Sequence, residues 1–148
     1  MNESISIQTI RLPVPGLDAL HSEALAEGYD FLDTLISEWQ TGENRFDRPG
    51  EVLYGCMEDG HLVAVGGLTV DPYVLSGEVG RIRRVYVRAA WRNRGVGRAL
   101  VTTLIGEARE GFAAVRLRAE NGDAGRLYER LGFTPIDDPN ATHTLRFA

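Results

Sequence analysis

A glycine-containing turn between a strand-like run and an amphipathic segment limits what this chain can fold into. Val85-Tyr86-Val87 has the β-branched and aromatic composition of a buried strand. The turn that follows reads Arg92-Asn93-Arg94-Gly95-Val96-Gly97. Beyond it, apolar residues recur with the spacing of one helical face: Leu100, Val101, Leu104, Ile105 and Ala108. This order predicts an anion-binding site, because the free N–H groups at the start of a helix point toward the ligand.

The side chains around this turn narrow the kind of anion. Arg92, Arg94 and Arg98 add positive charge, which favours phosphate groups. A Walker A loop would end in Gly-Lys-Ser/Thr, whereas this chain has Gly97-Arg98-Ala99. A dinucleotide fingerprint would need a third Gly or Ala where Leu100 stands. From these residues alone, a structural turn with solvated arginines is the alternative to a phosphate site.

A second segment, further along the chain, supports the phosphate-site interpretation. Asn121 is followed by Leu127-Tyr128-Glu129-Arg130-Leu131-Gly132-Phe133. The Arg-x-x-Gly-x-Gly turn and this Asn…Leu-Tyr-x-x-x-Gly-Phe segment, in this order, resemble the two motifs of the GNAT N-acyltransferase superfamily. Together they cover roughly residues 80 to 135. The resemblance implies the acyl-CoA N-acyltransferase (GNAT) fold, an α/β (α+β) architecture with a mixed, mostly antiparallel central sheet flanked by helices.

The same resemblance implies roles for individual residues. Main-chain groups of Val85, Tyr86 and Val87 would pair with the pantetheine of acetyl-CoA, and Tyr128 would protonate the departing thiolate. Gly95 and Gly97 would leave room for phosphate oxygens, and Asn121 would bind the cofactor arm. As structural alternatives, Tyr128 can be a core residue and Asn121 an ordinary loop residue. The full set expected to bind cofactor is Val85, Tyr86, Val87, Arg92, Asn93, Arg94, Gly95, Val96, Gly97, Arg98 and Asn121.

The general base is left open by the sequence. An alkylammonium acceptor has a pKa of about 10, so a group must take its proton or select the neutral form. Many relatives place a Glu at positions that correspond here to Arg81 and Arg116, and both are basic. Glu78, Glu120 and Asp71 are nearby candidates, each also explained as a surface acid, and a chain of water molecules would serve as well.

Two further hypotheses concern the site that would bind the acceptor. Arg81, Arg83 and Arg84 could bind a substrate carboxylate, or equally pair with carboxylates of the protein. Alternation along a strand predicts that Arg81 and Arg83 share one face while Arg84 lies on the other. Side chains of the N-terminal helices and the following loop could line the acceptor site, although helical spacing also suits a core: Tyr29, Phe31, Glu38, Trp39 and Phe46.

Composition excludes several other classes of protein. A length of 148 residues, with 43% apolar and 25% charged residues, fits one soluble domain spanning 1–148. No apolar run approaches the roughly 20 residues of a membrane span, and Met1-Asn2-Glu3-Ser4 does not begin a secretion signal, so we expect a cytoplasmic protein. The single Cys56 excludes an internal disulfide and is expected to be a buried hydrophobe. The three histidines lack metal-ligand spacing, so no metal is expected.

Charge is distributed unevenly along the chain. The net charge of −5 argues against nucleic acids and anionic membranes as partners. Between Arg81 and Arg98, however, there are arginines and no Asp or Glu. A local basic cluster on an acidic protein suits a compact polyanion, such as the phosphate groups of coenzyme A.

Periodicity and turn signals predict the remaining elements. Strands are expected over 4–11, 52–57, 62–70, 82–87, 113–119, 134–136 and 142–147. Helices are expected within 17–40, split at Gly28, then from about 100 to 109 and over 124–131. Asp123 is the expected N-cap of the last helix, and Gly132 is expected to end it. If the strand over 142–147 lies at a sheet edge, it could pair across a homodimer.

These features favour an acetyl-CoA-dependent N-acetyltransferase that moves an acetyl group to a primary amine of a small or amino-acid-like acceptor. The expected route is direct attack in a ternary complex. A non-catalytic acyl-CoA-binding domain is one alternative, and a protein N-terminal or lysine acetyltransferase is another. A nucleotide-binding domain of another kind leaves the Asn121–Phe133 segment unexplained.

Overall fold

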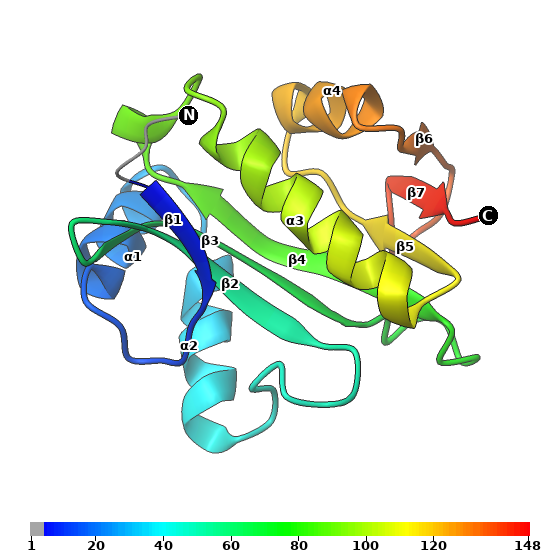
Figure 1. Cartoon of the computed structure of the whole chain (residues 1–148), viewed down its shortest axis with the longest axis horizontal. Helices are drawn as coiled ribbons and strands as arrows, with labels where there is room; N and C mark the ends of the chain where they lie inside the picture. Colours follow the sequence, from blue (N-terminus) through cyan, green and yellow to red (C-terminus); the bar gives the residue numbers. More distant parts are fainter. Residues whose placement is uncertain (1–4) are drawn as a thin grey trace.

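A single sheet runs through the computed structural model, which describes residues 5–148 (Figure 1). Its strands are β1 (Ile5–Thr9), β2 (Val52–Glu58), β3 (His61–Val70), β4 (Val79–Val87), β5 (Ala114–Leu117), β6 (Thr134–Pro135) and β7 (His143–Arg146). The helices are α1 (Leu17–Ala26), α2 (Phe31–Thr41), α3 (Val96–Gly111) and α4 (Gly122–Arg130), with a short 3-10 turn η1 (Ala89–Trp91). The secretion-signal prediction on Met1–Ser4, and the first residue of the predicted strand over 4–11, lie outside the described residues.

The strand order confirms the predicted mixed, mostly antiparallel sheet. The seven strands follow the order β1-β2-β3-β4-β5-β7-β6, and only β4 and β5 are parallel. Helix α3 crosses one face of the sheet, and α1 and α2 cover the other (Figure 1). Strand β7 lies between β5 and β6, because Thr134 and Pro135 pair with Thr144 and His143. The premise that the C-terminal strand forms the sheet edge is therefore wrong.

Each face of the sheet has its own core. On the α3 face, the predicted apolar stripe is buried, with Leu100, Val101 and Leu104 fully enclosed. On the other face, Trp39 and Phe46 belong to the core beneath α1 and α2, so the hypothesis that they line an acceptor site is wrong. A Cβ at Gly67 would lie 2.3 Å from Phe46 Cε1, which shows how closely this loop packs on the sheet. Cys56 is fully buried, as predicted.

A β-bulge in β4 changes which way its side chains face. Val65 pairs with Tyr86 and Gly67 with Arg83, so β4 has one more residue than β3 between these two pairs. Arg84 takes up the difference with a φ of 61°. Its side chain therefore reaches Glu38 of α2, on the face that Arg83 also occupies. The predicted opposite orientation of Arg84 is wrong, because simple alternation does not survive a bulge.

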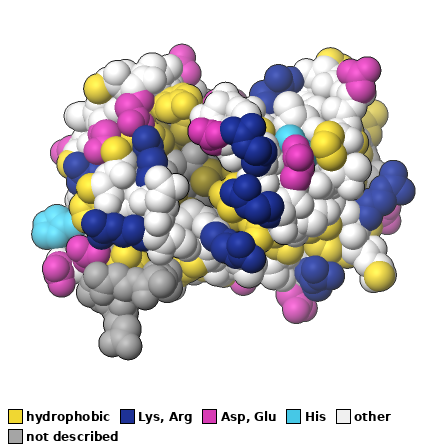
Figure 2. Space-filling view, turned by 90° about the horizontal axis from the view of Figure 1, so that it is seen from above, with side chains coloured by type: hydrophobic (Ala, Val, Ile, Leu, Met, Phe, Trp, Pro, Cys, Tyr) yellow, Lys and Arg dark blue, Asp and Glu magenta, His cyan; other side chains and the backbone are white. Residues whose placement is uncertain are grey.

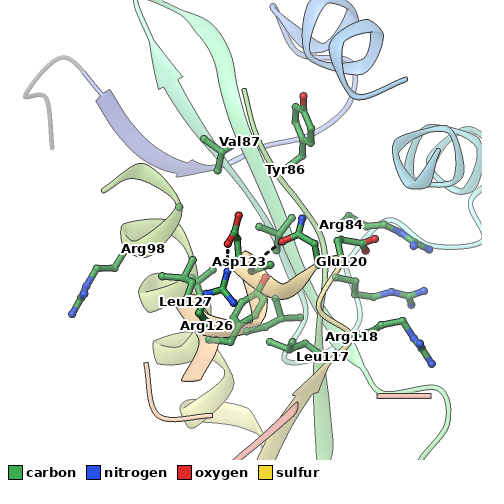
Figure 3. A pocket seen from close by; sticks show the side chains of 18 of the residues that line it. Arg84, Tyr86, Val87, Arg98, Leu117, Arg118, Glu120, Asp123, Arg126 and Leu127 are labelled. Carbon is green, nitrogen blue, oxygen red and sulfur yellow. Dashed lines mark hydrogen bonds and ion pairs between the residues drawn. The ribbon is translucent and has the colours of Figure 1, made fainter. Parts of the chain in front are cut away.

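The parallel ladder between β4 and β5 is short, and this opens the sheet. It consists of Val79 with Ala114, Gly80 with Val115 and Arg81 with Arg116. Beyond Arg81 the two strands diverge, which leaves the end of β4 without a neighbouring strand on that side (Figure 3). This divergence positions the site described next.

Candidate functional site

A cleft of about 1220 Å³ lies where β4 and β5 separate. Figure 2 shows the molecule hollowed between two lobes, with arginine side chains along one side of the hollow. The cleft brings together the two sequence motifs. Of the predicted site residues, those that line it are Val85, Tyr86, Val87, Arg92, Asn93, Gly95, Gly97, Arg98, Asn121 and Tyr128. Arg94 points elsewhere on the surface, and Val96 is buried in the α3 core.

The glycine-containing turn leads directly into α3. Gly95 is the N-cap residue with a φ of 83°, a left-handed conformation that glycine adopts without strain. Asn93 is also left-handed, with a φ of 60°. Within the described residues 5–148, no side chain caps the start of α3, so its first N–H groups can meet an anion at the cleft. A Cβ at Gly97 would contact Val87 at 3.4 Å, so close packing of the protein does not by itself demand glycine there.

The side chains of Arg92 and Tyr86 tie α1 to the cleft. Arg92 forms two hydrogen bonds with Glu27, at 3.0 and 2.5 Å, and donates to the Val87 carbonyl at 2.9 Å. The Tyr86 hydroxyl lies 2.5 Å from a Glu27 carboxylate oxygen and 2.9 Å from one of Glu23, and these two acids share its single proton as acceptors. The hydrogen bonds from Arg92 and Tyr86 lower the pKa of Glu27. Both side chains are thus engaged within the protein.

Tyr128 lies at the inner wall of the cleft. It is 7% exposed, and its ring packs edge-on against Phe133 at 5.7 Å. No hydrogen bond engages its hydroxyl among residues 5–148. Burial, and secondarily the charge of Glu120, raise the pKa of Tyr128, so the group is a neutral phenol at physiological pH.

Asn121 has a structural role that the sequence did not predict. Its side-chain oxygen accepts a hydrogen bond from the Ala124 N–H at 2.9 Å, so Asn121, and not Asp123, is the N-cap of α4. Its amide nitrogen donates to the Tyr29 hydroxyl at 3.3 Å. Gly132, with a φ of 106°, follows the end of α4 as predicted.

The three candidate carboxylate bases have different surroundings. Glu120 lines the cleft, and desolvation raises its pKa despite the opposing charges of Arg118 and Arg84 (Figure 3). Asp71 and Glu78 are outside the cleft lining. Of the three, only Glu120 can reach a substrate in the cleft.

Asp71 instead pairs with Arg81 and Arg116, the two positions at which the resemblance leads us to look for a glutamate base. Its side chain is fully buried and lies 3.4 Å from Arg81 and 3.1 Å from Arg116. Arg81 also donates to the Asn140 carbonyl at 2.7 Å, and Arg116 approaches Asp138 at 3.4 Å. Arg81 and Arg116 are the last pair of the β4–β5 ladder. This ion-pair cluster therefore lies at the point where the sheet opens.

Comparison with known proteins identifies the family to which the chain belongs. The acetyltransferase (GNAT) family pattern matches residues 17–133, most of the chain. The chain belongs to the GNAT acetyltransferase family. Among solved structures, a candidate acetyltransferase from Exiguobacterium sp. 255-15 has 24% sequence identity and a TM-score of 0.87, covering 99% of this chain and 94% of that one.

Two further GNAT neighbours show the same fold at lower similarity. The ribosomal-protein-S18-alanine N-acetyltransferase from Escherichia coli has 22% identity and a TM-score of 0.66, covering 95% of this chain and 89% of that chain. A mutant of the AtaT toxin, bound to the C-terminus of the antitoxin AtaR and to acetyl-CoA, has 13% identity and a TM-score of 0.73, covering 97% of this chain and 94% of that chain.

Among the described residues of this GNAT protein, no helix is long and apolar enough to cross a membrane.

Some residues of the cleft carry no signal in the sequence. Glu27 and Arg118 line it from the end of α1 and from beyond β5. Tyr29 and Phe31, which were candidates, line it as well, whereas Glu38 lines a smaller side pocket. Nothing local distinguishes Glu27 from other surface acids. The position of Glu27 at the cleft becomes clear only from its pairing with Arg92, which is distant in sequence.

Proposed function

We propose that this GNAT protein is an acetyl-CoA-dependent N-acetyltransferase acting on the primary amine of a small or amino-acid-like acceptor, within one domain spanning 1–148. The observation that carries the proposal is the placement of a buried phenol without a hydrogen-bond partner among residues 5–148, Tyr128, in the cleft that also receives the uncapped start of α3. A domain that only bound acyl-CoA would have no use for a protected proton donor there.

Acetyl-CoA would occupy the divergence of β4 and β5. Its pyrophosphate would meet the main-chain N–H groups from Asn93 to Arg98, with the charge of Arg98 nearby. Its pantetheine amides would pair with the unpaired edge of β4 near Val85 and Tyr86, as an added strand would. Because the Arg92 guanidinium is bound to Glu27, Arg92 would act by holding the turn in place instead of by contacting phosphate. The thioester would then lie beside Tyr128.

The reaction would proceed by direct transfer. The acceptor loses a proton, its free amine attacks the thioester carbonyl, and the tetrahedral species collapses with loss of the thiolate. Tyr128 would donate its phenolic proton to that sulfur and would be reprotonated by the proton that the attacking nitrogen loses as the amide forms. Its raised pKa keeps the phenol protonated until the thiolate develops. Glu120, directly or through water, would accept the proton from the ammonium group, and its raised pKa makes it a stronger base than an ordinary glutamate.

The test is thiol release from acetyl-CoA with a panel of amines and amino acids. Tyr128→Phe should lower kcat by at least about tenfold, within the range of general acid catalysis, while the affinity for acetyl-CoA stays unchanged. The matched control is Tyr54→Phe, since Tyr54 is a hydrogen-bonded tyrosine outside the cleft. An unchanged kcat in Tyr128→Phe would remove its role as the acid.

The same assay separates the alternatives. Acetyl-CoA binding without release for any acceptor would favour a non-catalytic acyl-CoA-binding domain. Release only with peptides would favour a protein acetyltransferase. A cytoplasmic location and a homodimer are further proposals, and cell fractionation and sedimentation velocity test them.

A further inference from the structure

Arg83 is a cation without a counter-ion at the inner end of the cleft. The neighbouring arginines have acid partners: Arg81 and Arg116 pair with Asp71, and Arg84 lies 3.5 Å from Glu38. Among residues 5–148, no carboxylate pairs with Arg83 and no hydrogen bond engages its side chain. Its Nε is buried without a partner. A guanidinium taken from water without compensating hydrogen bonds is destabilising, so an anion that supplied them would bind favourably.

Arg83 also connects two spaces. It lines the main cleft and a side pocket of about 240 Å³ between α2, the segment before β2 and the end of β3. The Thr69 hydroxyl, which lines this pocket, is also buried without a partner. Two residues with unsatisfied donors therefore line one small space, together with Glu38, whose Oε1 is also buried without a hydrogen bond.

Among residues 5–148, no acidic residue of the side pocket forms an ion pair with Arg83, although the charge of Glu38 acts on it. Glu38 approaches Arg84. The Glu51 oxygens accept from the N–H groups of Arg48 at 3.2 Å and Val70 at 3.0 Å. Burial lowers the pKa of Arg83, and the adjacent positive charge of Arg84 lowers it further, while the charge of Glu38 opposes this shift without reversing it.

We propose that the acceptor of this enzyme is an amino acid, and that Arg83, assisted by the Thr69 hydroxyl, binds its carboxylate. The inference rests on the proposed N-acetyltransferase function and names the substrate class. Arg83 directly precedes the Arg84–Val85 bulge, next to the part of β4 along which the pantetheine is proposed to lie. The amine and the carboxylate must then be close in the acceptor, as in α-amino acids and short ω-amino acids. A planar guanidinium can donate two parallel hydrogen bonds to such a carboxylate.

The experiment measures binding of reaction products, so that it does not depend on turnover. N-acetylglycine, N-acetyl-β-alanine and N-acetyl-4-aminobutyrate are titrated calorimetrically against the protein, with and without CoA, beside their carboxamides. We expect at least one carboxylate to bind about tenfold or more tightly than its amide, as for a hydrogen bond to a charged group. Arg83→Gln should abolish this preference. Arg146→Gln, which removes an exposed arginine outside the cleft, should keep it.

Several outcomes would overturn the inference. These are equal binding of carboxylate and amide in every pair, lack of binding by every carboxylate, or a preference that survives Arg83→Gln. If Arg83→Gln does not fold, Thr69→Val takes its place, and an unchanged carboxylate preference in that variant counts against the inference. A carboxylate preference on the acyl group instead, seen as faster turnover of succinyl-CoA than acetyl-CoA and lost in Arg83→Gln, would also overturn it. Turnover of uncharged amines without a carboxylate preference would leave the proposed function standing.

Discussion

The buried cluster around Asp71 gives the sharpest test of how this fold is held together. Asp71→Asn preserves the shape of the side chain and can keep the hydrogen bond that Oδ1 accepts from the Tyr73 N–H at 2.8 Å. It removes the one negative charge that both Arg81 and Arg116 approach. The variant therefore isolates the electrostatic contribution of the carboxylate.

The magnitude follows from burial. The Asp71 side chain has no exposure, and those of Arg81 and Arg116 are 9% and 14% exposed, so solvent screens the cluster weakly. Removing one member of a buried pair costs about 3–5 kcal/mol. Both arginines keep a second acceptor, which places the expected loss near the lower end, about 3 kcal/mol. With a urea m-value of about 2 kcal/mol/M, the unfolding midpoint should fall by about 1.5 M.

Urea unfolding followed by tryptophan fluorescence measures this loss, with Asp138→Asn as the matched control. Asp138 also contacts Arg116, at 3.4 Å, but its side chain is 32% exposed and solvent screens the pair, so its loss should cost clearly less than that of Asp71. A loss below about 1 kcal/mol for Asp71→Asn, or equal losses for the two variants, would refute the argument from burial. An altered m-value would show that the two-state comparison does not apply.

Three further predictions concern glycines and pH. Gly97→Ala should leave the free energy of unfolding unchanged or higher by up to about 1 kcal/mol, yet weaken acetyl-CoA binding in calorimetry by about tenfold or more if phosphate occupies that space. In urea unfolding, Gly67→Ala should lose about 2 kcal/mol because its Cβ would overlap Phe46, whereas Gly106→Ala on α3, with open space around it, should gain about 1 kcal/mol. The raised pKa of Glu120 means that it protonates, and stops acting as a base, at a higher pH than an ordinary glutamate. The acid limb of kcat/KM should therefore lie above pH 4.5 and disappear in Glu120→Gln.

Sequence periodicity predicted the helices and strands because each has a regular apolar face. The bulge at Arg84 escaped prediction, since a non-glycine residue with a φ of 61° leaves no pattern in the sequence. The pairing of Arg81 and Arg116 with Asp71 escaped it for a different reason. The sequence shows the positive charges of the two arginines. Their partner, Asp71, is determined by the contact between β4, β5 and the loop after β3, which no local pattern reveals.

Some residues of the candidate site could likewise be predicted from the sequence, and others could not. The residues of the turn and Tyr128 could be proposed because they belong to contiguous motifs, and the fold brings them to one cleft. The cap formed by Asn121 could not be separated from Asp123, because both residue types accept hydrogen bonds from helix N–H groups. The unpaired state of Arg83 depends on where every nearby carboxylate goes, and that is a property of the whole fold.

The short β4–β5 ladder also has a mechanical consequence. The sheet has two parts, β1–β4 and β5–β7–β6, whose strands pair through three residue pairs at one corner. Asp71 forms ion pairs with both residues of the last pair, Arg81 and Arg116. Because the ladder ends there, the width of the opening beyond Arg81 and Arg116 depends on the geometry of this corner. Asp71 would thus influence how closely the two parts of the sheet enclose a molecule bound between them, although Asp71 itself does not line the cleft.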